Sequence, residues 1–571
     1  MTQIKISNDY LLYGVTIEYD EIFVIPPFNQ PKRFYGAIRL WCIRDDYSKT
    51  NLYKTNGKYS VDRDKNGYTI SFDCDYTITE IDGIPACDIL ENSFDFSIDN
   101  ISLTDTVAGF YWKNLLCQCA EKSAMKIRDK WRSGYVLSTL ETNTYAGTYP
   151  AVDHEFHIRA RLAMGDEFDV SLVKRMMLLQ IKTMLTDRGN KMRIPCSVQP
   201  NGKREYKVMR KSLDKSVKAQ MFPLTGIIEL CEEMYNYYCL TKDIEFVKQN
   251  IKHIEAGMLN LERLIDEKGF LHAQVYYEDQ VMKDDLNAQA QAFAINSLML
   301  LARLENVIGN NERVKHYSNL SNILRASYQN YFWNEDKKLY IDYVNKDGSV
   351  HNHFHLLSNA LSVTLDINDD KTRDEVINKQ IADSDNEFQR FPSFLSADVS
   401  AYNESEIGSG GPYDLCAAGR YWCHDAKYRR SLGRADMIKN QLFTVLDMAK
   451  SNDYYMGERY DMNYTYYNTG KDTKQPWHGA SKYYEYPCTF IDVLIHDYFG
   501  IQPDEMADFR ICPCIVDNSK IKLEALGIKY SYNNGVYKIT NISDKKINIK
   551  LNHEIITLKP YEANQIVKPT N

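Results

Sequence analysis

The sequence predicts a multidomain α+β protein in which an (α/α)6 toroid is flanked by an N-terminal β-sandwich and a small C-terminal β-domain. Three observations predict this architecture. Apolar and polar residues alternate near both ends of the chain, as they do in strands that are half-buried in a sheet. Between those ends, apolar residues recur at the i, i+3, i+4 spacing of helices. A chain of 571 residues is long enough for one large core with accessory modules.

Both flanking modules are defined by short alternating runs. Residues 1–114 form the predicted β-sandwich, where the runs at 68–72 and 94–98 alternate and Asn-Gly turns separate the strands. Residues 508–571 form the predicted C-terminal β-domain, which includes the alternating run at 535–539.

Residues 115–507 form the predicted toroid. The predicted helices cover 169–185, 224–239, 244–266, 287–307, 314–331, 435–449 and 483–499. Gly500 and Pro503 follow the last of them, and glycine followed by proline is a signal for the end of a helix. Helical hairpins recur without a strict sequence period, which favours a closed ring over a solenoid.

Composition excludes several classes of protein. A net charge of −8 and a pI of about 5.9 argue against a nucleic-acid partner. No run of ~18 apolar residues could span a membrane. The N-terminus carries no apolar signal-peptide core, and the 13 cysteines are typical of free thiols in a reducing compartment. We therefore expect a cytoplasmic location, while the oligomeric state stays unknown.

No metal or other cofactor is expected. The C-x-C pairs at Cys117 and Cys512 lack the second pair that a zinc site needs. His351, His353 and His355 alternate in a short run. A metal trio is one interpretation of these histidines, and we favour the alternative that they are ordinary hairpin residues.

The most informative stretch is Glu458-Arg459-Tyr460, which a tyrosine-rich loop separates from Trp477-His478. Aromatic rings stack on the apolar faces of sugar rings, carboxylates and arginine bind hydroxyls, and one carboxylate can activate water. The stretch therefore predicts a carbohydrate-binding site.

A second group of candidates lies upstream. Asp153 and Glu155 are carboxylates in one short segment, and Arg159 is suited to clamp an acidic group. Tyr277-Glu278-Asp279 occupies a predicted loop between two long helices. Loop tips at one end of a toroid line its cleft, so we expect Asp279 to lie near Glu458.

These motifs resemble those of six-hairpin glycosidases, and most of all those of the inverting α-L-rhamnosidase family. The segment 153–166 is similar to the first catalytic loop of that family, which begins with Asp and closes with Gly-Asp, here Asp166. The 277–279 triplet is similar to its Gly-Asp-Trp element, Glu458-Arg459-Tyr460 to its Glu-Arg-Trp element, and Trp477-His478 to its Asn-His element.

The resemblance implies an inverting, two-carboxylate glycoside hydrolase in which Glu458 is the general base. The remaining motif residues are the predicted substrate-binding set: Asp166, Arg159, Tyr277, Glu278, Arg459, Tyr460, Trp477 and His478. By the same spacing, the general-acid glutamate of the family falls on Arg159, which cannot donate a proton near neutral pH. The acid is therefore Glu155, Asp153 or Asp279, or the chemistry differs.

The predicted function is hydrolysis of an oligosaccharide or glycoside, and the resemblance suggests an α-L-rhamnosidase-like activity. Two alternatives stay open: a polysaccharide lyase or phosphorylase on the same fold, and a non-catalytic carbohydrate-binding protein. The last follows from the departure at Arg159.

Overall fold

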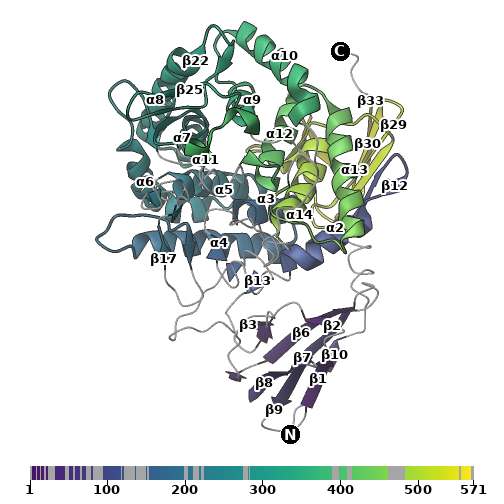
Figure 1. Ribbon diagram of the computed structural model, residues 1–571. Coiled ribbons are helices and arrows are strands. Elements are labelled where there is room, and N and C mark those ends of the chain that lie inside the picture. The colour runs from purple at the N-terminus through teal and green to yellow at the C-terminus, as the bar shows by residue number, and fades with distance from the viewer. Residues whose placement is uncertain are drawn as a thin grey trace.

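The computed structural model describes in full residues 94–111, 155–166, 169–197, 224–273, 283–385, 415–460, 483–551 and 554–564, with shorter stretches between them. For residues 3–81 it describes the backbone of the strands. Figure 1 shows a large helical body, with one group of strands from the N-terminal part of the chain and another group beside the C-terminus.

The N-terminal strands form two sheets, in the orders β1-β9-β8-β5 and β10-β7-β6-β4-β3, and β2 pairs with β6. Their bounds are β1 Gln3–Ser7, β2 Tyr10–Leu12, β3 Val15–Glu18, β4 Glu21–Phe23, β5 Arg33–Tyr35, β6 Ala37–Arg44, β7 Thr50–Thr55, β8 Lys58–Asp64, β9 Gly67–Phe72 and β10 Thr79–Ile81. The run predicted at 68–72 is thus a strand. In Figure 1 these strands lie outside the helical body.

The C-terminal strands also form two sheets. One has the order β12-β11-β28-β29-β30-β33, and the other has the order β26-β27-β31-β32. Their bounds are β11 Phe94–Ile98, β12 Ile101–Ser102, β26 Ile501–Gln502, β27 Phe509–Ile511, β28 Ser519–Leu523, β29 Ile528–Asn533, β30 Val536–Asn541, β31 Ile547–Leu551, β32 Glu554–Leu558 and β33 Ala563–Val567.

One strand is not where the sequence placed it. The run at 94–98 was expected in the N-terminal β-sandwich, but β11 pairs antiparallel with β28, and Phe96 lies opposite Ile521. Its alternating burial confirms a strand with one face in the core. Alternation identifies such a strand without naming its partner, because the partner here lies more than 400 residues away in the chain.

Six helices contact one another in cyclic order. They are α3 His154–Met164, α5 Thr225–Thr241, α7 Ala288–Val307, α9 Leu356–Thr364, α12 Gly419–Ser431 and α14 Glu485–Asp492, which continues as η6 Val493–Tyr498. Each packs on the next in chain order, and α14 packs on α3, so the contacts close into a ring. We call these the inner helices.

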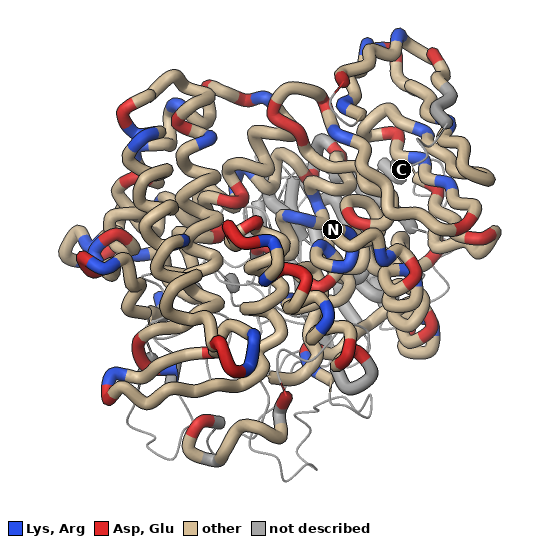
Figure 2. Tube along the Cα trace, turned by 90° about the horizontal axis from the view of Figure 1, so that it is seen from above, with Lys and Arg blue, Asp and Glu red and all other residues tan. Residues whose placement is uncertain are grey.

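A second helix packs outside each inner helix. These outer helices are α2 Thr104–Phe110, which continues as η1 Tyr111–Leu116, α4 Glu167–Leu185, α6 Ile244–Glu262, α8 Asn311–Ser327, which continues as η2 Tyr328–Phe332, α10 Lys371–Phe388 and α13 Ala435–Ser451. Figure 2 shows acidic and basic residues interspersed over these helices. Among the described residues, no helix is both long and apolar enough to cross a membrane.

The outer helices explain why helical periodicity was visible in the sequence. In α6 the buried residues Phe246, Asn250, Ile254 and Leu261 recur along one face, and the opposite face is polar. Predicted and observed bounds agree closely for the outer helices α4, α6 and α13, and also for the inner helices α5 and α7.

Short strands connect the helices. They are β13 Cys119–Ala120, β14 Tyr135–Val136, β15 Tyr149–Pro150, β16 Ser197–Val198, β17 Arg204–Glu205, β18 Val208–Met209, β19 Lys218–Ala219, β20 His272–Ala273, β21 Asp285–Asn287, β22 Trp333–Asn334, β23 Leu339–Tyr340, β24 Tyr343–Asn345 and β25 Val350–His351. Strands β20 and β21 precede the inner helix α7, strands β24 and β25 precede the inner helix α9, and the four strands form one sheet. Two further short helices, η3 Val399–Ala401 and α11 Glu404–Ile407, follow α10.

The inner helices run in the same direction. One cavity is lined by residues from the C-terminal halves or ends of all six, among them Leu162 of α3, Arg303 of α7 and Arg430 of α12. Their N-terminal ends therefore lie at the opposite end of the ring, and this is the end to which Glu458 belongs.

Candidate active site

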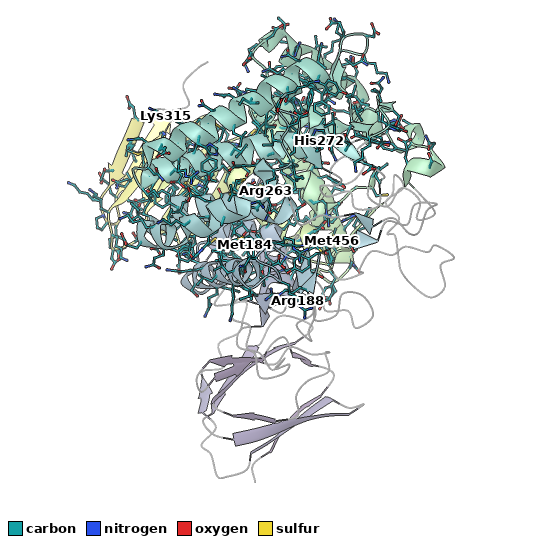
Figure 3. The ribbon with its side chains drawn as sticks, turned by 90° about the vertical axis from the view of Figure 1, so that its left-hand side faces the viewer. Met184, Arg188, Arg263, His272, Lys315 and Met456 are labelled. Atoms are coloured by element: carbon teal, nitrogen blue, oxygen red, sulfur yellow. The ribbon has the colours of Figure 1, made fainter. Side chains whose placement is uncertain are left out.

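The segment 456–460 is tied across the N-terminal ends of two neighbouring inner helices. The backbone N–H groups of Tyr460 and Ala417 each donate to the carbonyl of the other, both at 3.0 Å. The N–H of Tyr483 donates to the carbonyl of Met456 at 2.9 Å, and Figure 3 labels Met456. Ala417 lies just before α12 and Tyr483 just before α14, so this segment closes the gap between the two helices.

Four charged side chains, alternating in sign, form a row between this segment and the two helices. Nη1 of Arg459 lies 2.9 Å from Oε2 of Glu485, and the Nε of Arg420 donates to Oε1 of the same carboxylate at 3.0 Å. Nη2 of Arg459 lies 3.6 Å from Oε1 of Glu458, and its Nη1 donates to the Glu458 carbonyl at 2.9 Å. All four side chains are almost completely buried.

Glu485 lies at the centre of this row of charges, between Arg420 and Arg459. Burial alone would raise the pKa of the Glu485 carboxyl, but the charges of Arg420 and Arg459 outweigh burial and hold that pKa below its ordinary value. The carboxylate therefore stays ionised and fixes both guanidinium groups. Arg459 in turn provides a fixed positive charge beside Glu458, which favours the ionised carboxylate that a general base needs.

Tyr460 supports the segment from inside. Its hydroxyl accepts the N–H of Gly457 at 2.7 Å, and its ring packs edge-on against Tyr486 at 5.5 Å. Burial raises the pKa of Tyr460 to about 12. A buried ring in this position does not offer its face to a sugar, so we assign Tyr460 to holding the loop that carries Glu458.

Gly419 permits the close approach of α12 and α14. A Cβ at this position would lie 2.6 Å from the carbonyl carbon of Glu485 and 2.8 Å from its Cβ. Only glycine leaves room for the first turns of the two helices to touch, and this contact brings Arg420 to Glu485.

The Gly419→Ala variant should therefore lose both stability and function. Overpacking at a helix contact costs about 1–3 kcal/mol, and the displaced Glu485 would shift Arg459 and Glu458. Thermal unfolding and sugar turnover measure the two effects. Ser431→Ala, at the exposed end of the same helix, is the matched control and should change stability by less than ~0.5 kcal/mol. Equal stability and turnover in both variants would contradict the role given to Gly419.

The segment 153–166, expected as a loop, is largely the inner helix α3. Its charged residues fit a buried helix because they are paired. The Nε of Arg159 donates to Oε1 of Glu155 at 2.7 Å, and its Nη2 donates to Oε1 of Glu232 at 2.6 Å. Arg161 pairs with Asp169, while Asp166 lies exposed just beyond the helix. Arg159 and Arg161 are therefore both engaged in ion pairs within the protein.

These contacts bear on the choice of general acid. Two nitrogens of Arg159 donate to one oxygen of Glu155, and this stabilises the carboxylate rather than the protonated acid. Glu155 is therefore a poor proton donor. The other expected acids, Asp153 and Asp279, lie outside the described residues, as do the expected binding residues Tyr277, Glu278, Trp477 and His478.

A second buried charge cluster, missed in the sequence, lies at the same end of the ring. Nζ of Lys283 is 2.7 Å from Oδ1 of Asp342, and Tyr402 donates to the other oxygen. Burial would raise the pKa of Asp342, but Lys283, His355 and Tyr402 together outweigh burial, so the pKa lies below its ordinary value. The carbonyl of Asp342 accepts the N–H of Ala288, the first residue of α7, which places the cluster at an inner-helix N-terminus. No motif marks Lys283 or Asp342, because their pairing depends on contacts between distant segments.

His351, His353 and Glu406 are the described residues whose spacing suits a metal ion. Their hydrogen bonds do not fit one. Nε2 of His351 faces the amide nitrogen of Asn345 at 3.1 Å, and the amide oxygen of Asn345 is taken by the N–H of Asp284. Nε2 is therefore an acceptor, and Nδ1 carries the proton that it donates to Glu406 at 2.7 Å. A metal ligand needs the reverse arrangement, in which the far nitrogen is the donor.

Glu406 should instead govern part of the acid stability. Burial would raise the pKa of Glu406, but bonds from His353, the N–H of Asn403 and Tyr343 lower it to about 2. Because the folded pKa lies below the unfolded one, the stabilisation is complete above pH ~4.5 and is lost as the pH falls toward 2.

The Glu406→Gln variant should consequently be less stable by about 1–3 kcal/mol at pH 7 and should lose less stability than the parent between pH 5 and 2. Urea unfolding across this range measures both. Glu375→Gln, at an exposed position of α10, is the control and should follow the parent curve. A Glu406→Gln curve parallel to the parent would show that this carboxyl does not titrate as described.

One family model and several solved structures resemble this protein. A family model described as Trehalase matches residues 231–397, which is less than half of the chain. No curated protein matches the sequence. The match falls on the inner helices α5 to α9 and on the outer helices that pack around them.

Solved structures extend the likeness over most of the chain. The GH78 family rhamnosidase of Bacillus sp. GL1 has a TM-score of 0.54 at 10% identity, covering 87% of this chain and 47% of that one. The α-L-rhamnosidase of Dictyoglomus thermophilum has a TM-score of 0.54 at 10% identity, covering 90% and 53%. A structure named Sialidase has a TM-score of 0.52 at 12% identity, covering 93% and 51%.

These likenesses confirm the resemblance to rhamnosidase-like six-hairpin glycosidases at the level of fold. The chain spans about half the length of the solved structures it matches. At such low identity the solved structures show the fold alone, and the family model matches residues 231–397 only.

Proposed function

We propose that the protein is an inverting glycoside hydrolase whose catalytic domain is an (α/α)6 toroid and whose substrate is an oligosaccharide or glycoside. The observation that carries the proposal is the buried carboxylate of Glu458, fixed beside Arg459 at the N-terminal ends of α12 and α14. The cyclic order of the inner helices and the fold likeness to rhamnosidases support it.

Glu458 is the proposed general base. It would take a proton from a water molecule as that water attacks the anomeric carbon from the face opposite the leaving group. The contact with Arg459 keeps the carboxylate charged and ready to accept the proton, and Glu485 keeps Arg459 in place. The backbone bridges to Ala417 and Tyr483 fix the position of the segment that carries the base.

The general acid is proposed to be Asp153 or Asp279. Inversion requires a second carboxyl about 6.5–9.5 Å from the first, so that a water molecule fits between base and sugar. Asp153 immediately precedes the first residue of α3 in the sequence. The inner helix α3 packs against α14, whose first residue is Glu485. Glu155 is the least favoured of the three candidate acids, because its contacts with Arg159 stabilise the ionised carboxylate.

One rival has a specific observation in its favour. Arg159 occupies the position that the resemblance assigns to the acid, and it forms ion pairs with Glu155, Glu232 and Asp492. A protein that kept the cleft and lost the acid would bind carbohydrate without cleaving it. A lyase or phosphorylase on the same fold remains the other alternative.

A panel of aryl glycosides separates these functions. We expect hydrolysis of at least one, with inverted anomeric configuration when the first product is followed by NMR. Glu458→Gln keeps the shape and removes the base, so turnover should fall by ~10²–10⁴-fold while binding survives.

The matched control for Glu458→Gln is Glu524→Gln, an exposed glutamate of the C-terminal β-domain, which should keep full turnover. Retained turnover in Glu458→Gln would show that another carboxylate is the base. Binding without cleavage would establish the carbohydrate-binding rival, and an unsaturated product from a uronate polymer would establish a lyase.

A further inference from the structure

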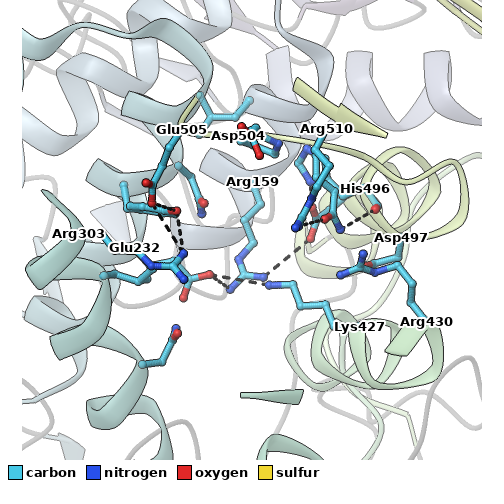
Figure 4. Close-up of a pocket in the computed structure, with 18 of the residues that line it drawn as sticks. Arg159, Glu232, Arg303, Lys427, Arg430, His496, Asp497, Asp504, Glu505 and Arg510 are labelled. Atoms are coloured by element: carbon cyan, nitrogen blue, oxygen red, sulfur yellow. Dashed lines mark hydrogen bonds and ion pairs between the residues drawn. The ribbon is translucent and has the colours of Figure 1, made fainter. Parts of the chain in front are cut away.

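A cavity of about 600 Å³ lies at the end of the ring opposite Glu458 (Figure 4). Arg159 of α3 lies toward its centre, surrounded by residues of the other inner helices, and the segment 502–506 of the C-terminal module borders it. Its volume lies in the range of small-molecule sites. Nothing in the proposed hydrolysis uses this cavity.

The charges around the cavity nearly balance. Six Lys or Arg side chains and five carboxylates line it. Several are paired across it: Lys427 lies 3.8 Å from Glu232, and Lys550 lies 3.4 Å from Asp504. A net-charged ligand would therefore gain little from the lining as a whole, whereas a neutral ligand rich in hydrogen-bonding groups would meet donors and acceptors on every side.

Two buried carboxylates in the lining have unused acceptor capacity. Within the described part of the chain, neither oxygen of Asp497 accepts a hydrogen bond, and Oδ2 of Asp492 accepts none. Nε of Arg430 lies 3.1 Å from Asp497 as an ion pair, but its N–H has no hydrogen-bond acceptor among these residues. Both aspartates are at least nine-tenths buried. Buried carboxylate oxygens normally accept several hydrogen bonds, so the cavity calls for an occupant that supplies donors.

The pKa values of the two carboxyls are consistent with the lack of hydrogen-bond donors at Asp497. Burial raises the pKa of Asp497 to about 6 despite the nearby charge of Arg430. Burial would also raise the pKa of Asp492, but His496, which is hydrogen-bonded to it, and the charges of Arg159 and Lys427 together lower it to about 2. Asp497 thus lacks the stabilisation that a donor provides to its neighbour.

We propose that this cavity is a second ligand site, which binds a neutral polyhydroxylated molecule the size of a monosaccharide. Ligand hydroxyls would donate to Asp497 and Asp492 and accept from Lys427, while Leu300 and the ring of Tyr235 provide apolar contact. The site does not require that the protein hydrolyse anything. It adjoins Arg159, whose other bonds hold Glu155 one helical turn nearer the candidate active site.

Isothermal titration calorimetry with L-rhamnose, D-glucose and D-mannose tests the site, with inorganic phosphate as the anionic comparison. We expect at least one hexose to bind with a dissociation constant on the order of 0.1–1 mM, as suits a ligand of about a dozen heavy atoms. Phosphate should bind more weakly than that hexose, because the nearly balanced charges of the lining give an anion little net attraction and phosphate has fewer donors for the two aspartates.

Four variants locate the binding. Asp497→Asn removes a charged acceptor and should weaken hexose binding by about 10–100-fold. Asn296→Phe, at a half-buried lining position of α7, fills the cavity and should abolish binding. Glu458→Gln, at the other end of the ring, should leave this binding unchanged. Asp447→Asn, exposed on α13 and away from the cavity, is the matched control for the charge change.

Thermal melts show which variants are folded, and Asn296→Phe keeps the test intact if Asp497→Asn unfolds, because it alters no ion pair. The proposal is overturned by the absence of hexose binding at about a hundred times the expected dissociation constant, which would mean that water alone fills the cavity. It is also overturned by hexose binding that Glu458→Gln removes and the two cavity variants do not, or by tighter binding of phosphate than of any hexose.

Discussion

Glu485 lies almost fully buried between Arg420 and Arg459, and the end of the ring that holds Glu458 depends on this contact. The guanidinium groups of Arg420, in the first turn of α12, and of Arg459, in the segment 456–460, would repel each other without a carboxylate between them. The carboxylate is available there because Gly419 lets α14 approach α12. Removing Glu485 would take this shared carboxylate from two buried guanidinium groups, and the loss of a buried ion-pair partner costs several kcal/mol in other proteins.

The same principle governs the inner helices as a group. Arg161 pairs with Asp169, and Arg429 pairs with Asp425 one turn away and with Asp385 of α10. Each pair links an inner helix to itself or to an outer helix. Because desolvation cancels much of the attraction in a buried pair, these contacts contribute more to the placement of the helices than to net stability. A site that must hold a carboxylate in one position gains from such placement.

Much of the architecture could be predicted from the sequence, and the part that could not has a common physical cause. Helices with one apolar face, such as α6 and α13, carry the 3.6-residue period and were found with nearly correct bounds. The inner helices α3 and α12 carry buried Arg, Glu, His and Asp, so they lack that period and were missed as helices. The outer helix α10 was missed because it is rich in polar residues, and the strand at 94–98 was found but assigned to the wrong sheet.

The candidate site likewise has one part that could be predicted from the sequence and one part that could not. Glu458 and Arg459 are adjacent in the chain and lie in a motif, so the sequence brought them together. Glu485 lies 26 residues from Arg459 and 65 residues from Arg420 in the chain, and only the folded ring pairs it with both. Glu155 and Arg159 were recognised as candidates, but their mutual contact, which disfavours Glu155 as the acid, needed helix α3 to place them on one face.

The position of a bound sugar tests the central claim most directly. A crystal structure of the Glu458→Gln variant soaked with an aryl glycoside that the parent protein cleaves should show the glycosidic bond at the N-terminal ends of α12 and α14. The substituted side chain at position 458 should lie within hydrogen-bonding distance of a water molecule on the face of the sugar opposite the leaving group. A glycoside bound with its scissile bond elsewhere on the protein, with residue 458 making no contact to sugar or water, would contradict the account.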